Sequence, residues 1–219
     1  MGSPPLVRRR LDAAAAVAGL ALFGLCALVA DRGVPAPERA VFSWINGLPD
    51  SLTVATHTIQ FLGVLAVGPI VAVIALAARR PRLAAAALIV TALKLLAERF
   101  VWRLVARDRP GMTEPGAVIR GGTPTTGLSF VSGHVVLVTG LAWCVTPYLR
   151  GAWRSAPWIV VTLVAFARIY LGAHNPLDVL GGLGLGLAVG ALTNLIVGVP
   201  QPISTGAPTS DPYSVQDPS

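Results

Sequence analysis

The sequence predicts an all-α fold, a polytopic membrane bundle of about six transmembrane helices. Hydrophobic residues make up 54% of the 219 residues and charged residues only 12%, against about 25% charged in soluble domains. The mean hydropathy is +0.69. The apolar residues also gather in long runs, each close to the roughly 20 residues that a helix needs to cross a bilayer.

These runs give the expected spans in chain order. The first follows Arg8, Arg9 and Arg10, a pattern that also begins a signal peptide. Leu28 is a poor residue three positions before a cleavage site, and the run is long enough to cross a membrane, so we expect a retained span. The expected spans are residues 11–30, 54–78, 83–105, 131–148, 157–173 and 177–198.

Arginines in the connections predict the orientation, because short cytoplasmic loops are enriched in basic residues. Arginines precede the first run, separate the second from the third, and separate the fourth from the fifth. We therefore expect a multi-pass protein of the cell membrane with both termini in the cytoplasm. Around the membrane domain of residues 11–199 we expect a basic N-terminus (1–10) and a disordered tail (200–219), which is rich in Pro, Ser, Thr and Asp.

The formal net charge of +7 does not indicate nucleic-acid binding, because the positive residues follow the loops of a membrane topology. Cys26 and Cys144 lie inside apolar runs, where free thiols act as small hydrophobic side chains. No spacing of Cys or His indicates a metal site or a disulfide framework. We expect no metal and no cofactor, and the sequence leaves the oligomeric state open.

The expected outer loops carry two unusual features. Residues 31–53 combine prolines with an amphipathic segment that includes Trp44, which predicts an interfacial helix. The second outer loop, residues 106–130, and the end of the span before it hold an excess of arginine, although outer loops usually contain few basic residues. Contacts with lipid headgroups are one explanation and binding of an anionic substrate is the other. These arginines are Arg103, Arg107, Arg109 and Arg120.

The most informative segment runs from Arg168 to Asp178, at the mouth between the last two spans. Asn175 and Pro176 are typical of a helix start, which puts Asp178 in the first turn. His174 precedes Asp178 by four residues. A carboxylate at that spacing can hold one imidazole nitrogen as a donor and leave the other as a nucleophile or base. A simple capping arrangement explains the same residues equally well.

Ser132, Gly133 and His134 open the fourth run. Free backbone donors at a helix start bind anions, and glycine lets an oxyanion approach the backbone. His134 can then protonate a leaving alkoxide. The simpler interpretation is an ordinary serine N-cap beside a hydrated histidine at the membrane interface. Arg109 and Arg168 offer forks of donors that match phosphate oxygens. Arg107 is either a third donor or a surface charge.

Lys94 and Glu98 lie one turn apart within the third expected span. An intramembrane charge costs several kcal/mol unless it is paired, and a spacing of four residues allows a Lys–Glu pair. A structural pair is the favoured interpretation. A polar lining of the substrate route is the alternative.

Together these clusters resemble the type 2 phosphatidic acid phosphatase superfamily, also called the lipid phosphate phosphatases. Its signature comprises Lys-x6-Arg-Pro, Pro-Ser-Gly-His and Ser-Arg-x5-His-x3-Asp. The resemblance covers roughly residues 54–198. Here the first element ends at Arg109-Pro110, the second reads Val131-Ser132-Gly133-His134, and the third reads Ala167-Arg168, five residues, His174, three residues, Asp178.

The resemblance implies a role for each matching residue. His174 would be the nucleophile that forms a phosphohistidine, with Asp178 orienting it. His134 would be the acid for the leaving group and then the base for water. The phosphate would be bound by Arg109, Arg168, Ser132 and the Gly133 amide, and no metal is implied.

The sequence departs from the signature at three positions. Trp102 occupies the lysine position and cannot donate to phosphate in the same way. Arg103, one residue later, is the expected substitute. Val131 replaces the proline and Ala167 replaces the serine, which removes a rigid turn and a hydroxyl.

We therefore expect a metal-independent phosphatase that acts at the extracytoplasmic face on a phosphomonoester or pyrophosphate of a lipid. The substrate would be a polyprenyl phosphate derivative or a phospholipid, and its tail would stay in the bilayer. Two other functions remain open on the same residues: a lipid phosphotransferase with an alcohol acceptor, and a non-catalytic lipid-binding or transport protein. Retention of His134, His174 and Asp178 argues against a protein that only binds.

Overall fold

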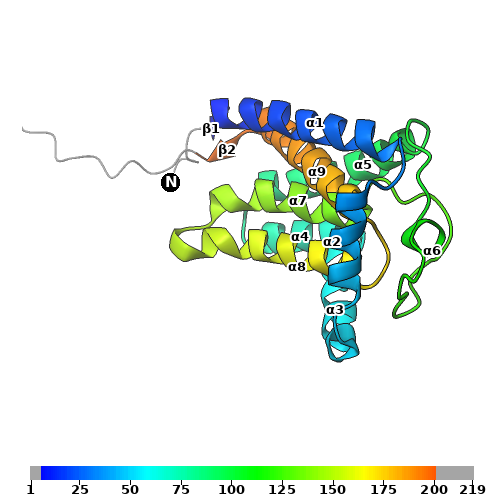
Figure 1. Cartoon of the computed structure of the whole chain (residues 1–219). Helices are drawn as coiled ribbons and strands as arrows, with labels where there is room; N and C mark the ends of the chain where they lie inside the picture. Colours follow the sequence, from blue (N-terminus) through cyan, green and yellow to red (C-terminus); the bar gives the residue numbers. More distant parts are fainter. Residues whose placement is uncertain (1–5, 201–219) are drawn as a thin grey trace, which may run out of the picture.

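The computed structural model describes residues 6–200, whose regular secondary structure is almost entirely helical (Figure 1). Residues 1–5 of the basic N-terminus and residues 201–219 of the predicted tail lie outside the described residues. The main helices are α1 (Arg10–Ala30), α2 (Ala36–Asn46), α3 (Thr53–Gln60), α4 (Val67–Ala77), α5 (Pro81–Val101), α7 (Gly133–Val145), α8 (Ala156–Tyr170) and α9 (Pro176–Val197). Shorter elements are α6 (Pro110–Thr113), η1 (Asp50–Leu52), η2 (Phe61–Gly63), η3 (Thr146–Tyr148), η4 (Gly151–Ser155) and the strands β1 (Leu6–Val7) and β2 (Val199–Pro200).

Each expected span has a helical counterpart, and the second one is broken. Residues 50–63 and helix α4 are bent by 64° at a short break. Gly63 lies against the side chain of His134, where an added Cβ would come within 2.8 Å of the histidine Cβ. Within residues 6–200, α1 and α9 are long and apolar enough to cross a membrane, and the bent pair would make a third span.

Helix α9 is the centre of the bundle, with α1 along one side and α7 along another (Figure 1). Close approach to α1 depends on a pair of glycines. A Cβ on Gly184 would meet the Gly19 carbonyl at 2.8 Å, and a Cβ on Gly19 would meet the Gly184 carbonyl at 2.6 Å. Small residues of this kind let two membrane helices pack backbone to backbone.

The two ends of the bundle differ in composition. At one end, Arg80 donates to the Tyr148 carbonyl and Arg82 to the Val197 carbonyl, both at 3.2 Å. Strand β1 pairs antiparallel with β2 at the same end. Helices α2 and α6 and the loop before α9 lie at the other end (Figure 1). The arginine-rich connections and the expected outer loops are thus separated. Which end faces the cytoplasm stays a prediction.

A buried carboxylate ties three helices together at the arginine-rich end. Asp12 is fully buried and accepts hydrogen bonds from Arg9 at 2.6 and 2.8 Å. It also accepts from the Trp143 indole at 2.8 Å and from the Asn194 amide at 3.3 Å. Because Trp143 lies on α7 and Asn194 on α9, this one side chain fixes the start of α1 against both helices.

Candidate active site

The clusters singled out in the sequence meet around a cavity of about 470 Å³ at the end of the bundle opposite Asp12. The candidate residues that line it are Arg109, Gly133, His134, Arg168 and His174. Other polar residues in the wall are His57, Gln60, Lys94, Glu98 and Thr123, and apolar ones are Phe61, Val64, Trp102, Leu128 and Val131. Segments far apart in the sequence therefore build one polar cavity with an apolar flank.

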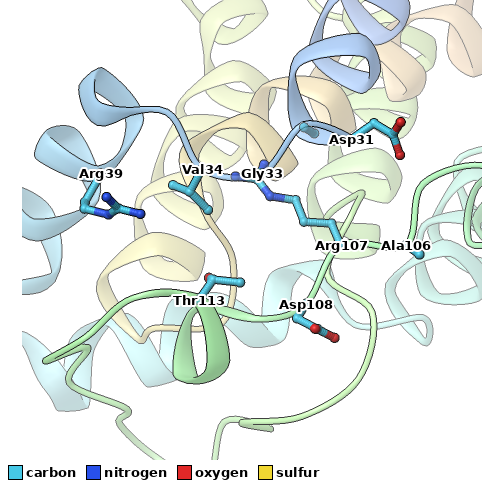
Figure 2. Close-up of a pocket in the computed structure, with 9 residues that line it drawn as sticks. Asp31, Gly33, Val34, Arg39, Ala106, Arg107, Asp108 and Thr113 are labelled. Carbon is cyan, nitrogen blue, oxygen red and sulfur yellow. The ribbon is translucent and has the colours of Figure 1, made fainter.

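A second, smaller pocket of about 330 Å³ lies between the end of α1, the start of α2 and the loop before α6 (Figure 2). Its wall includes Asp31, Arg39, Arg107, Asp108 and Thr113. Neither candidate histidine lines this pocket. The larger cavity is therefore the candidate active site.

The turn between α8 and α9 brings Arg168 and His174 into one cavity. The Arg168 carbonyl accepts hydrogen bonds from the amides of Ala173 and His174 at 3.1 and 3.2 Å. Gly172 makes the turn with φ +75°, and a Cβ there would lie 2.7 Å from the Val118 carbonyl. Glycine suits this position because it adopts positive φ without strain. This turn places Arg168 and His174 in the wall of the same cavity.

His174 lies next to Asp178, as the spacing predicts. Its Nδ1 is 3.7 Å from Asp178 Oδ2, longer than a hydrogen bond, and both side chains are buried. The same carboxylate oxygen accepts from the Asn175 amide at 2.8 Å. Burial lowers the pKa of His174 to about 4, although Asp178 acts in the opposite direction. The neutral imidazole therefore predominates at neutral pH.

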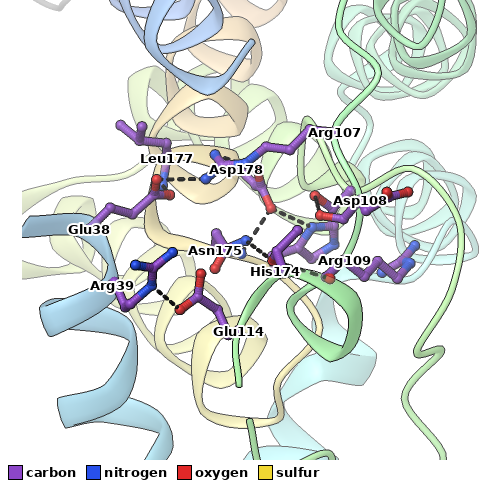
Figure 3. Close-up of polar contacts among 12 residues, drawn as sticks. Glu38, Arg39, Arg107, Asp108, Arg109, Glu114, His174, Asn175, Leu177 and Asp178 are labelled. Atoms are coloured by element: carbon purple, nitrogen blue, oxygen red, sulfur yellow. Dashed lines mark hydrogen bonds and ion pairs between the residues drawn. The ribbon is translucent and has the colours of Figure 1, made fainter. Parts of the chain in front are cut away.

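Asp178 also belongs to a buried ion-pair network (Figure 3). Arg107 donates to Asp178 Oδ1 at 3.2 Å and to Glu38 Oε2 at 2.6 Å. The other Glu38 oxygen accepts from the Leu177 amide, in the first turn of α9, at 2.8 Å. The Arg107 side chain is only 2% exposed. Arg107 is therefore neither a surface charge nor a lining residue of the larger cavity. It binds the Asp178 oxygen that does not face His174.

Glu38 was missed in the sequence. It lies on α2, within the segment expected to form an interfacial helix, and shares a buried face with Phe42 and Asn46. The signal available in the sequence was an acidic residue four positions before Phe42, and therefore on the same face of the expected helix. Burial raises the pKa of Glu38, and its bonds to Arg107 and Leu177 oppose that shift.

The start of α7 contributes to the cavity unequally. Gly133 and His134 line it. Ser132, predicted to bind phosphate, is fully buried and is not part of the lining. Its amide donates to the Asp178 carbonyl at 3.0 Å, and its hydroxyl has no hydrogen-bond partner within residues 6–200. Ser132 therefore joins the starts of α7 and α9 in this arrangement.

The two lining arginines keep donors available. Arg109 donates to the Ala173 carbonyl at 3.0 Å, and Arg168 donates to the Gln60 side-chain oxygen. In the part of the chain that the structure describes, Nε of each arginine has no partner. Arg107 Nε, outside the cavity, is unpaired too. What distinguishes Arg109 and Arg168 is that both line one polar cavity, and two guanidinium groups there are typical of an anion site.

The expected substitute for the family lysine lies elsewhere. Arg103 is exposed and does not line the cavity, whereas Trp102 does. Lys94 and Glu98 form the predicted pair at 2.7 Å, and both also line the cavity. Arg120, another of the surplus arginines, donates to the Asn46, Leu48 and Tyr170 carbonyls and anchors its loop.

The chain is similar to known proteins over much of its length. Residues 59–200 match the family model described as the PAP2 superfamily. Over 96 residues, 44% of the chain, it is 36% identical to decaprenylphosphoryl-5-phosphoribose phosphatase of Mycobacterium tuberculosis, and it spans about half (51%) of that relative's length.

Two crystal structures share the fold. The first transmembrane PAP2 type phosphatidylglycerolphosphate phosphatase from Bacillus subtilis matches with a TM-score of 0.65 at 20% identity, over 81% of this chain and 94% of that one. LpxE of Aquifex aeolicus matches with a TM-score of 0.60 at 21% identity, over 70% of this chain and 92% of that one.

Proposed function

The chain belongs to the PAP2 superfamily, and from that membership we propose that it is a membrane lipid phosphatase. It hydrolyses a phosphomonoester or pyrophosphate of a lipid at the extracytoplasmic face. The observation that carries this proposal is the convergence of His134, His174, Arg109 and Arg168 on one cavity. Two histidines and two arginines with free donors supply a nucleophile, an acid and anion-binding groups.

The reaction takes place in two displacements at phosphorus. His174 is neutral, and because Asp178 lies beside Nδ1, Nε2 carries the attacking lone pair. A bond forms between Nε2 and phosphorus as the bond to the leaving oxygen breaks, which gives a phosphohistidine. His134 gives its proton to the leaving oxygen and then takes one from water. Water attacks phosphorus, the P–N bond breaks, and inorganic phosphate and neutral His174 result.

The cavity suits a lipid substrate because part of its wall is made of exposed apolar side chains. Phe61 and Trp102 line the cavity and are 55% and 40% exposed. Large apolar side chains on the outside of a membrane bundle contact lipid tails. The phosphate would bind among the arginines while the tail leaves between η2 and the end of α5.

Among lipid phosphates, a polyprenyl phosphate derivative is the proposed substrate. The curated relative from Mycobacterium tuberculosis is named for a decaprenylphosphoryl compound. The phosphatidylglycerolphosphate phosphatase with the same fold makes a phospholipid the next substrate class to test.

Phosphate release from a lipid panel tests this function. The purified protein in detergent, with a chelator present, is given polyprenyl phosphates, polyprenyl diphosphates, phosphatidate and phosphatidylglycerophosphate. We expect release without an added alcohol, loss of release in His174→Ala, and normal release in Arg154→Gln, an exposed arginine at the opposite end. Consumption of the lipid phosphate only with an alcohol acceptor, with the phosphoryl group recovered on that alcohol and no inorganic phosphate released, would instead identify a phosphotransferase. Binding without turnover would identify a lipid-binding protein.

A further inference from the structure

Lys94 and Glu98 lie directly over the start of α7. A Cβ added to Gly133 would lie closest to a Glu98 carboxylate oxygen and would come within 2.8 Å of Lys94 Cε. The two side chains are 13% and 16% exposed, with Nζ 2.7 Å from Oε2. Both line the same cavity as His134 and His174. The ion pair within α5 is therefore part of the cavity wall.

We propose that Lys94 is a phosphate-binding residue of this site and that Glu98 is its positioning residue. This inference rests on the proposed function and deepens it. Lys94 would contribute a third cation beside Arg109 and Arg168. Lys94 lies about two helical turns before Trp102, the residue that occupies the lysine position of the family signature.

The position of the pair favours this role over simple neutralisation. A lysine and a glutamate four residues apart can neutralise each other on any face of a membrane helix. This pair instead faces the glycine at the N-terminus of α7, where backbone donors and the helix dipole attract anions. An ammonium has three donors, so Lys94 can keep its bond to Glu98 and still donate to a phosphate oxygen.

Glu98 has a distinct task in this arrangement. The Glu98 carboxylate lies 2.7 Å from Lys94 Nζ and fixes the direction of the lysine side chain in the cavity wall. Without Lys94, however, the same carboxylate would repel an incoming phosphate.

A double-mutant cycle separates binding from neutralisation. The four proteins are wild type, Lys94→Met, Glu98→Gln and the double variant. The readouts are KM for the lipid and the competitive inhibition constant for inorganic phosphate. If Lys94 binds phosphate, the double variant stays weakened by about 10- to 100-fold in both, as expected for a lost charge-assisted hydrogen bond. A double variant within threefold of wild type would overturn the proposal, because removing Glu98 would then cancel the loss of Lys94.

Three further variants complete the test. Lys94→Arg is expected to keep phosphate affinity within about fivefold, because it retains charge and donors. Arg99→Met removes a charge from an exposed position of the same helix and is expected to leave both constants unchanged. If the Met variant does not fold, Lys94→Gln with Glu98→Gln replaces the ion pair by a neutral pair and is judged by the same threefold limit.

The outcome does not depend on the proposed function alone. Absence of phosphate release by the folded wild-type protein on every lipid would refute the phosphatase. Wild-type turnover, with all Lys94 variants equal to Arg99→Met, would refute only the role of Lys94.

Discussion

Two fully buried aspartates lie at opposite ends of the bundle, and their surroundings differ in one respect. Asp12 has four hydrogen bonds, from Arg9, Trp143 and Asn194. Asp178 is also paired, with Arg107 and the Asn175 amide. The difference is the histidine beside Asp178: His174 Nδ1 faces the carboxylate but has no hydrogen-bond partner within residues 6–200.

The difference teaches that burial and ion pairing do not mark a functional carboxylate. Both aspartates hold helix starts together, and both are completely inaccessible. What distinguishes Asp178 is that a titratable ring stands between it and a polar cavity. The comparison therefore predicts that Asp12 acts on stability and Asp178 on catalysis.

The largest effect is expected from Asp178→Asn. The amide keeps the shape of the side chain but cannot stabilise the positive charge that the His174 ring gains when Nε2 is phosphorylated, or hold its tautomer, so kcat should fall by roughly 10²–10⁴-fold. Steady-state phosphate release measures it, with thermal unfolding as the control for the loss of Arg107's partner. A kcat within a factor of three of wild type would make Asp178 a structural residue like Asp12.

The pH dependence is the next test. With the pKa of His174 at about 4 instead of 6.5, the reactive neutral ring persists well into the acid range. After correction for ionisation of the substrate, the acid limb of kcat/KM should lie near pH 4. Because the folded state binds fewer protons than the unfolded state, this histidine's contribution to stability is lost as the pH falls from about 6.5 to 4. An acid limb near 6.5 would contradict the buried environment.

Asp12→Asn should separate stability from catalysis. The neutral amide weakens the bonds from Arg9 and turns one acceptor position into a donor, at a cost of about 1–3 kcal/mol in unfolding free energy. Thermal unfolding in detergent should report a lower midpoint, while kcat per folded molecule stays at the wild-type value. A fall in kcat without a fall in the midpoint would show that the two ends are coupled.

The smallest effect is expected from Glu38→Gln. The two carboxylate oxygens accept separately from Arg107 and from the Leu177 amide. Glutamine keeps only one acceptor oxygen, so it retains one of these two hydrogen bonds and the ion pair is lost. Arg107 then interacts more strongly with Asp178 alone, and we expect kcat to fall by about two- to fivefold. Phosphate release from the same lipid checks this, and Ser43→Ala, at an exposed position of the same helix, is the control.

Much of the fold could be predicted because membrane helices correspond to long apolar runs in the sequence. The break between η2 and α4 could not, because the apolar character of residues 54–78 continues across it. Gly63 lies at the break and Gly68 and Pro69 follow it, but these residues do not reveal that Gly63 packs against His134, which is distant in the sequence. Local propensity contains no information on that contact.

The candidate site was predictable where spacing sets geometry, as for His174 and Asp178 within one turn. It was not predictable where packing between segments decides. Lys94 and Glu98 were expected as a pair, but their place over Gly133 follows from how α5 meets α7. Arg103 looked like the substitute for the missing lysine by sequence distance, yet it lies outside the cavity lining. The roles of the site residues remain predictions.

The unequal lengths of the helices affect the bilayer itself. At 1.5 Å per residue, α1 and α9, with 21 and 22 residues, are about 32 Å long and match a hydrocarbon core of about 30 Å. Helix α8, with 15 residues, is only about 22 Å long. Lipid beside α8 must thin or the helix must sink to relieve this hydrophobic mismatch. Acyl-chain length in the surrounding membrane therefore becomes a variable that acts on the protein.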